Sequence, residues 1–219
     1  MKLIVIEGID GCGKQTQANL LVEFLCGQGK KVLYLNFPNY ESESSSLVKM
    51  YLNGEFGDNA GSINAYSASS FYAVDRVATF TKVDLTQYDY LICDRYTTSN
   101  AIHQASKLSN GERDTFLHWL FDYEYNLLNI PRPDKVILLD VKPETTRRLR
   151  LTRPLKNGKE NDIHEKDYKY LEKCYECAKY CANKYGWQII NCEDDKDLLP
   201  IGNIHVQVVK SLKLEGLLE

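Results

Sequence analysis

A glycine-rich segment containing one lysine directly follows the first apolar stretch of the chain. Residues 8–14 read Gly-Ile-Asp-Gly-Cys-Gly-Lys, which matches the pattern Gly-x-x-x-x-Gly-Lys. In such a segment, glycines allow backbone N–H groups to approach a phosphate closely, and the lysine adds a positive charge for the terminal phosphates of a nucleotide. We therefore predict a nucleotide site formed by this segment and the two residues after it: Gly8, Ile9, Asp10, Gly11, Cys12, Gly13, Lys14, Gln15 and Thr16.

The residue after the lysine departs from this pattern, which normally places Ser or Thr there to bind Mg²⁺. This chain has Gln15 at that position and Thr16 behind it. The amide oxygen of Gln15 offers a ligand to the metal, directly or through a water molecule, whereas Thr16 offers its hydroxyl if the start of the helix rotates slightly. We favour Gln15, with Asp94 as a second ligand of Mg²⁺.

A carboxylate and a guanidinium follow another apolar stretch, Tyr88–Cys93, as the pair Asp94-Arg95. In α/β proteins, ligands bind at the carboxyl ends of the strands. Arg95 is therefore expected beside the phosphate-binding segment, where its fork of N–H donors is suited to hold a phosphate. The alternative interpretation is an ion pair on the surface, which requires no ligand.

The elements that must position these residues alternate along the chain. Apolar stretches predict strands at Lys2–Glu7, Lys31–Phe37, Tyr88–Cys93, Asp134–Val141 and Trp187–Asn191. Helical patterns run from the lysine through Leu25 and then occupy Leu47–Asn53, Ile63–Lys82, Ser99–Lys107, Gly111–Leu128, Glu144–Leu151, Glu165–Tyr185 and Ile204–Leu214. This alternation indicates βαβ crossovers. We predict one α/β doubly wound domain over residues 1–219, with a five-stranded parallel sheet and helices on both faces.

The composition excludes several classes of protein. The 219 residues include 27 basic and 30 acidic ones, a net charge of −3, and 43% are apolar, which argues against disorder and against a basic surface that coats nucleic acid. No apolar run approaches the ~20 residues that cross a bilayer, and Glu7 follows the start too closely for a secretory signal. Seven cysteines, an odd number, indicate a reducing compartment, so we expect a cytoplasmic protein.

Three of these cysteines, Cys174, Cys177 and Cys181, share one face of a predicted helix. We interpret them as core residues rather than zinc ligands.

A phosphate-binding segment alone is compatible with GTPases, helicase and motor ATPases, and small-molecule kinases. A GTPase should carry Asn-Lys-x-Asp to bind guanine, and the nearest string, Asn183-Lys184-Tyr185-Gly186, lies within a predicted helix. Helicases need a longer chain and contacts to nucleic acid. The sequence therefore favours a small-molecule kinase.

The motifs together resemble those of the thymidylate kinases, ATP-dependent enzymes that convert dTMP to dTDP, over nearly the whole chain. The segments that carry the resemblance are Glu7–Lys14, Phe37-Pro38, Tyr72–Arg76, Asp94–Tyr96 and Thr97–Gln104. The resemblance implies ATP as the phosphoryl donor, dTMP as the acceptor, Mg²⁺ as the metal and a homodimer as the assembly.

The resemblance also implies roles in the acceptor site. Asp10 is expected near the sugar 3′-hydroxyl, Tyr72 is expected to stack on thymine, and Arg76 is expected to donate to thymine O4. Asn100 and Gln104 carry amides, which present a donor and an acceptor to the edge of the base. The acceptor site implied in this way comprises Asp10, Pro38, Tyr72, Arg76, Arg95, Ser99, Asn100 and Gln104.

Besides Gln15, two positions depart from the family pattern, and two alternative functions stay open. Tyr40 stands where an arginine is expected after Phe-Pro, and His103 stands where relatives often have Tyr or Phe. A deoxynucleoside kinase is one alternative, but it should carry a carboxylate base where this chain has Pro38 and Asn39. A nucleotide-binding module without catalysis is another, because Gln15 and Tyr40 both depart from the pattern.

A basic stretch at residues 147–163 resembles the mobile lid of the same family. Because Gly11 and Cys12 occupy the variable positions of the phosphate-binding segment, we expect the lid to supply the catalytic arginine. Arg153 is the first candidate, followed by Lys156 and Arg148. With Lys14 and Arg95, Arg153 completes the predicted catalytic set.

Overall fold

Five parallel strands form the sheet of the computed structural model, which describes residues 1–57, 59–151, 168–194 and 197–218. The strands are β1 (Lys2–Glu7), β2 (Val32–Asn36), β3 (Tyr90–Asp94), β4 (Lys135–Asp140) and β5 (Gln188–Asn191). They lie in the order β2-β3-β1-β4-β5, with Ile4 opposite Ile92 on one side of β1 and Ile6 opposite Ile137 on the other. Each predicted strand is present within two residues of its predicted bounds.

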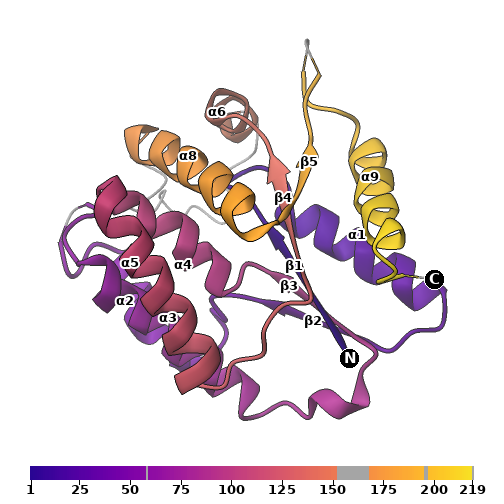
Figure 1. The fold of residues 1–219 in the computed structure, drawn as a ribbon, viewed down its shortest axis with the longest axis horizontal. Helices are drawn as coiled ribbons and strands as arrows, with labels where there is room; N and C mark the ends of the chain where they lie inside the picture. Colours follow the sequence, from indigo (N-terminus) through magenta and orange to yellow (C-terminus); the bar gives the residue numbers. More distant parts are fainter. Residues whose placement is uncertain (58, 152–167, 195–196, 219) are drawn as a thin grey trace.

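Helices cover both faces of this sheet (Figure 1). On one face lie α1 (Lys14–Gly27) and α9 (Ile201–Leu214); on the other lie α3 (Ala65–Phe80), α4 (Thr97–His103), α5 (Asn110–Phe121) and α8 (Tyr168–Tyr185). The described α-helices also include α2 (Ser46–Leu52) and α6 (Pro143–Leu151), and 3₁₀ turns occur at Glu43–Ser45, Leu85–Gln87 and Ala105–Lys107. The predicted α/β fold with a five-stranded parallel sheet and helices on both faces is confirmed.

The central strand β1 contributes side chains to the core on both faces of the sheet. Leu3 and Val5 pack in the cluster formed with α4, α5 and α8, whereas Ile4 and Ile6 pack in the cluster formed with α1 and α9. None of the four is more than 1% exposed. A parallel strand covered on both faces is expected to be apolar throughout, which explains why β1 was recognisable in the sequence.

Three cysteines of α8 belong to the same core. Cys174, Cys177 and Cys181 are fully buried, and the thiols of Cys177 and Cys181 each lie 3.4 Å from the Ala101 carbonyl oxygen on α4. Burial raises the pKa of Cys174 to about 12, so this sulfur stays a neutral thiol. The interpretation of these cysteines as core residues is confirmed.

The helix predicted over Gly111–Leu128 is present, but its type changes in the last part. The α-helical hydrogen bonding of α5 ends at Phe121, and Asp122–Leu127 forms a π-helical segment. The side chain of Glu124 in this segment is completely buried and accepts hydrogen bonds from α3 and α4. The wider π-helical turn accompanies an inward-facing carboxylate, in keeping with the frequent occurrence of such turns at functional sites.

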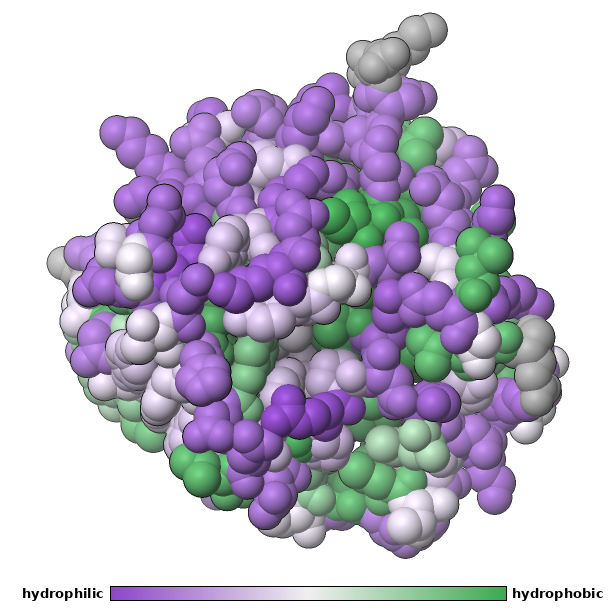
Figure 2. All heavy atoms as spheres, viewed as in Figure 1, coloured by the Kyte–Doolittle hydropathy of each residue, from purple (hydrophilic) through white to green (hydrophobic). Residues whose placement is uncertain are grey.

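Hydrophilic side chains predominate on the face of the molecule drawn in Figure 2, and hydrophobic ones occur there in separate patches. Within the described ranges, no helix has both the length and the apolar composition that a membrane span needs.

Candidate active site

The glycine-rich segment forms a tight turn between β1 and α1. Gly8 has a φ of 151°, and a Cβ at this position would lie 2.5 Å from Cys12 Sγ and 3.0 Å from the carbonyl oxygen of Leu139. Gly13 has a φ of 94° and precedes Lys14, the first residue of α1. The Lys14 ammonium donates to the Ile9 carbonyl oxygen at 2.9 Å. The turn thus encloses a lysine and directs the first N–H groups of a helix outward, an arrangement that binds phosphate.

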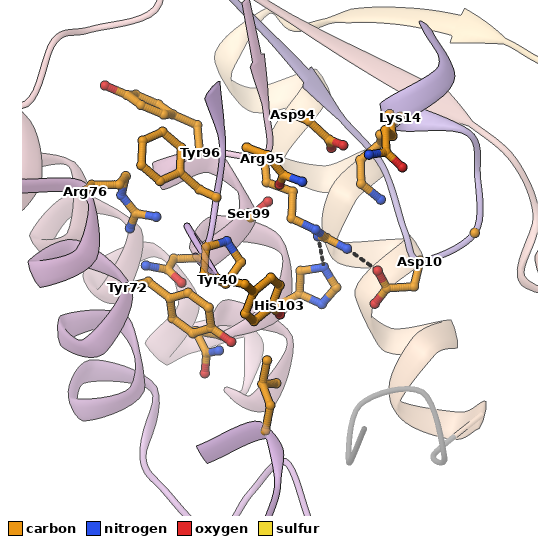
Figure 3. A pocket seen from close by; sticks show the side chains of 18 of the residues that line it. Asp10, Lys14, Tyr40, Tyr72, Arg76, Asp94, Arg95, Tyr96, Ser99 and His103 are labelled. Carbon is orange, nitrogen blue, oxygen red and sulfur yellow. Dashed lines mark hydrogen bonds and ion pairs between the residues drawn. The ribbon is translucent and has the colours of Figure 1, made fainter. Parts of the chain in front are cut away.

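A cavity of about 330 Å³ opens beside this turn (Figure 3). Its lining includes residues of the turn, the segment after β2, the end of β3, and helices α3 and α4. The strands β1 and β3 are neighbours, but the chain continues from their carboxyl ends to opposite sides of the sheet. Ligands of doubly wound proteins bind at this kind of switch point.

Arg95 lies next to the glycine-rich turn, where its position after β3 predicted it. Its backbone has a φ of 66°, its Nη2 contacts the carboxylate of Asp10, and its Nη1 lies 3.1 Å from Nε2 of His103. Burial alone would lower the pKa of Arg95, but the carboxylates of Asp10, Glu7 and Asp94 outweigh this effect and raise it. The guanidinium therefore stays charged in the cavity, flanked by two side chains (Figure 3).

The contact with Arg95 determines the tautomer of His103. A guanidinium only donates hydrogen bonds, so Nε2 of His103 accepts one and the ring proton resides on Nδ1. Nδ1 lies 3.4 Å from Sγ of Cys174, which has lone pairs to accept this proton. His103 thus connects Arg95 to the core cysteine of α8.

Two carboxylates support the end of β3 in different ways. Glu7 is completely buried and accepts hydrogen bonds from the Tyr96 N–H at 3.2 Å, the Thr98 hydroxyl at 2.6 Å and the Ser99 hydroxyl at 2.9 Å. Burial raises the pKa of Glu7, against the opposing effect of the Arg95 charge. The hydroxyl of Ser99, predicted as a substrate contact, is therefore held by Glu7, although Ser99 also lines the cavity.

Asp94 is the second of these carboxylates. Its side chain is 5% exposed, and Oδ1 is buried without a hydrogen-bond partner in the described part of the chain. Burial raises the pKa of Asp94, and the charges of Lys14 and Arg95 oppose that rise. Gln15 lines the same cavity. A carboxylate oxygen without a donor, together with a nearby amide oxygen, is a donor set that fits Mg²⁺.

The aromatic and basic residues of α3 lie at the other end of the cavity. Tyr72 and Arg76 both line it, whereas Phe71 turns away and packs against Tyr51 and Phe56. The adjacent aromatic residues therefore have separate roles: Phe71 belongs to the core and Tyr72 faces the cavity (Figure 3).

The predicted site did not include Glu124. Its carboxylate accepts hydrogen bonds from two of the three nitrogens of the Arg76 guanidinium. It accepts from Nε at 2.7 Å and from Nη2 at 2.6 Å, and both side chains are at most 2% exposed. The same carboxylate accepts from Nδ2 of Asn100 at 3.3 Å, and the Ser69 carbonyl oxygen accepts from this Nδ2 at 3.3 Å as well. Asn100 therefore offers an acceptor to the cavity, not the expected donor and acceptor together. In Gln104, by contrast, both amide atoms are buried without a partner among the described residues.

Other predicted residues also line the cavity. Pro38, which follows a cis peptide bond after Phe37, and Tyr40, which stands at the arginine position, are both among the lining residues. In the basic stretch, Arg147 lies over the Tyr168 ring and Arg148 contacts Asp197 at the surface. Arg153 and Lys156 fall outside the described residues.

The strand order, the glycine-rich turn after the central strand and the cation at the end of the neighbouring strand define a P-loop nucleotide kinase. A family model described as "Thymidylate kinase" matches residues 6–199, and the chain belongs to that family. It is 32% identical over 200 residues to the thymidylate kinase of Mycobacterium tuberculosis, covering 88% of this chain and 92% of the relative. It is 28% identical over 218 residues to the thymidylate kinase of Plasmodium falciparum, covering 98% and 92%.

Solved structures of this family have the same fold. The thymidylate kinase of Candida albicans superposes with a TM-score of 0.70 at 20% identity, covering 98% of this chain and 92% of the other. The protein is thus a phosphotransferase that converts dTMP to dTDP with ATP as the phosphoryl donor.

Proposed function

We propose that the cavity binds both nucleotides, with ATP on the phosphate-binding turn and dTMP between Arg95 and Tyr72. The observation that carries this proposal is the position of Arg95, whose guanidinium lies in the cavity against Asp10 of the turn. Arg95 receives the phosphate of dTMP through charge-assisted hydrogen bonds. The backbone N–H groups of residues 8–14 and the ammonium of Lys14 receive the β- and γ-phosphates of ATP.

This arrangement suits phosphoryl transfer without a general base. The phosphate of dTMP is already an anion, so the protein must mainly hold the two phosphates in line and neutralise their charge. Lys14 and Arg95 provide positive charge on the two sides of the transferred group. The lid residue Arg153, outside the described residues, is proposed to cover that group when both substrates are bound.

The residues at the end of β3 fit a divalent cation. We propose that Asp94, whose buried Oδ1 lacks a donor, and Gln15, whose amide oxygen replaces the usual hydroxyl, hold Mg²⁺ directly or through water. When bound, Mg²⁺ neutralises charge on the β- and γ-phosphates of ATP. Asp94 and Gln15 would then orient the triphosphate toward Arg95.

Three broader expectations also stay proposals. We propose that residues 1–219 form one domain and that two copies of the chain form a homodimer. We also propose that the protein works in the cytoplasm. The seven cysteines, all within the described ranges, form no disulfide, which supports a reducing compartment. Light scattering after gel filtration, at several concentrations, tests the homodimer: a mass of one chain at all of them would contradict it.

A coupled assay of ADP release tests the assignment of substrates. The wild-type protein with ATP and Mg²⁺ is assayed with dTMP, thymidine, dUMP, dCMP and dGMP, and dTDP is identified by chromatography. We expect the highest kcat/KM with dTMP and no turnover of thymidine, while Lys14→Ala should abolish turnover of all acceptors. Turnover of thymidine in preference to dTMP would support a deoxynucleoside kinase instead, and ATP binding without any product would support a non-catalytic module.

A further inference from the structure

The carboxylate of Glu124 is completely buried and is surrounded by hydrogen-bond donors. Oε1 accepts from Nη2 of Arg76 at 2.6 Å and from Nδ2 of Asn100 at 3.3 Å. Oε2 accepts from Nε of Arg76 and from the Thr97 hydroxyl, both at 2.7 Å. The donors come from α3 and α4, and two of these residues, Arg76 and Asn100, also line the cavity. Glu124 itself lies behind them and is not part of the lining.

This carboxylate determines which amide atom Asn100 presents. The Glu124 carboxylate and the Ser69 carbonyl oxygen are both acceptors, and Nδ2 of Asn100 lies 3.3 Å from each. Turning the amide over would place Oδ1 against these two acceptors, which is unfavourable because no donor would lie between them. Both protons of Nδ2 are therefore used inside the protein, and Oδ1 is left as the acceptor that Asn100 offers to a ligand.

Arg76 is constrained in the opposite sense. Glu124 holds Nε and Nη2, so Nη1 is the guanidinium nitrogen that this carboxylate does not engage. Nη1 donates hydrogen bonds and never accepts them. The cavity thus presents a donor from Arg76 and an acceptor from Asn100, and one buried carboxylate sets both.

Gln104 does not impose such a pattern. Gln104 is 1% exposed, and neither Oε1 nor Nε2 of its amide has a partner in the described part of the chain, so no contact among the described residues fixes which atom the amide presents.

We propose that Glu124 is a positioning residue that makes the acceptor site selective for 4-oxo over 4-amino pyrimidines. A 4-oxo pyrimidine has an acceptor at O4 beside a donor at N3–H, which complements the donor of Arg76 and the acceptor of Asn100. A 4-amino pyrimidine has the reverse pattern, an amino donor at C4 beside an acceptor at N3. It would place donor against donor and acceptor against acceptor, and each mismatch is expected to lower binding by roughly 10- to 100-fold. The inference rests on the proposed placement of the base between Tyr72 and Asn100.

The test compares dTMP and dCMP as acceptors for Glu124→Gln. Glutamine replaces one acceptor of the carboxylate with a donor, so Asn100 is no longer confined to one amide orientation. We expect the ratio of kcat/KM for dTMP to that for dCMP to fall at least tenfold. A ratio within about twofold of the wild-type value in folded Glu124→Gln would overturn the proposal.

Thr97→Val and Glu124→Asp serve as matched controls. Thr97→Val removes a donor from the same buried carboxylate without changing its charge or its contacts with Arg76 and Asn100. It should lower the melting temperature and leave the dTMP to dCMP ratio unchanged. Glu124→Asp keeps an acceptor-only group at this position, so it should retain most of the preference even if turnover falls. A Thr97→Val ratio that falls as far as that of Glu124→Gln would show that the effect is merely loss of packing.

Glu124→Gln leaves the Arg76 charge buried without its carboxylate, so this variant can fail to fold. A measurement on the wild-type protein tests the proposal in that case. The side-chain amide of Asn100 is assigned by NMR through the signal lost in Asn100→Ala. Its two protons are expected to exchange slowly with water, both without and with dTMP. Protons that exchange freely until dTMP binds would overturn the proposal, because Nδ2 would then face the ligand.

These outcomes are distinct from failure of the proposed function. If wild-type protein forms dTDP and Glu124→Gln keeps its preference, only the role of Glu124 is wrong. If the wild-type protein forms no dTDP, the placement of dTMP in this cavity is wrong.

Discussion

Arg95 Nη2 contacts the Asp10 carboxylate, although the two residues lie 85 positions apart in the sequence. The contact forms because β1 and β3 are neighbouring parallel strands whose carboxyl ends meet at one edge of the sheet. Asp10 belongs to the turn that we assign to ATP, and Arg95 is the cation that we assign to the dTMP phosphate. One ion pair thus connects the two halves of the proposed site.

Gln15 provides a test of the metal site. If its amide oxygen helps to hold Mg²⁺, Gln15→Ala should raise the Mg²⁺ concentration needed for half-maximal turnover by about tenfold, the lower end of the usual effect of weakening a metal site. Gln15→Thr restores the usual hydroxyl and should stay within about threefold of wild type. An unchanged Mg²⁺ requirement in Gln15→Ala would remove Gln15 from this role.

Asp94→Asn is expected to stabilise the protein in the absence of substrates at neutral pH. Burial raises the pKa of Asp94 above its ordinary value of 3.8, so the folded protein binds this proton more readily than the unfolded chain. Ionisation of Asp94 therefore lowers the free energy of unfolding as pH rises from 3.8 through the raised pKa. Asp94→Asn avoids this loss, so its melting temperature should exceed that of wild type; for a chain of this size each 1 kcal/mol gained corresponds to about 2–4 °C.

Melting curves across pH check that expectation. The difference in melting temperature should be smallest at pH values well below 3.8, where Asp94 is neutral in both the folded and the unfolded state, and should grow as pH rises. The same variant should lose turnover. A melting temperature for Asp94→Asn below that of wild type at neutral pH would contradict the account.

The neighbours Phe71 and Tyr72 are expected to respond differently to truncation. Tyr72→Leu removes a ring from the cavity, and because stacking contributes about 1–3 kcal/mol per base, KM for dTMP should rise roughly 10- to 100-fold. Phe71→Leu removes a ring that packs against Tyr51 and Phe56, so it should lower the melting temperature and leave KM nearly unchanged. Steady-state kinetics and thermal melts separate the two, and equal effects on KM would argue against stacking by Tyr72.

Arg153→Ala tests the lid. An arginine that covers the transferring phosphoryl group contributes about 10³- to 10⁵-fold to the rate in related chemistry, so kcat should fall by roughly two or more decades with a modest change in dTMP affinity. Lys156→Ala and Arg148→Ala, measured alongside, show whether another cation has this role. Arg148 already contacts Asp197, so its loss is expected to matter least. A decrease in kcat of less than about threefold for Arg153→Ala would exclude it.

The parts of this site that could be predicted from the sequence are those marked by a motif within one short segment of the chain. The phosphate-binding turn is one continuous segment, and Arg95 directly follows an apolar strand, so strand order alone brings the two together. The positions of Tyr72 and Arg76 follow from their spacing on one helix. The strands were recognisable because burial on both faces requires an apolar run.

Glu7 and Glu124 could not be assigned in the same way, because their partners come from distant elements. Glu7 binds Thr98 across 91 positions, and Glu124 binds Arg76 across 48. Nothing in the sequence around Glu124 distinguishes it from the neighbouring Asp122, which instead accepts from Asn126 at the surface. The π-helical segment that turns Glu124 inward also has no pattern of its own in the sequence. The restriction on the Asn100 amide depends on this carboxylate and was missed with it.

Calorimetric titration of dTMP and thymidine into wild type and Arg95→Gln, without ATP, gives the sharpest test of whether Arg95 holds the acceptor phosphate, because the two ligands differ only by that phosphate. Wild type should bind dTMP much more tightly than thymidine. In Arg95→Gln the ratio of the two dissociation constants should shrink by at least about tenfold, the scale of one or two lost charge-assisted hydrogen bonds, while thymidine affinity stays within about threefold. If Arg95→Gln kept the full wild-type preference for dTMP over thymidine, Arg95 would not be the residue that holds the acceptor phosphate.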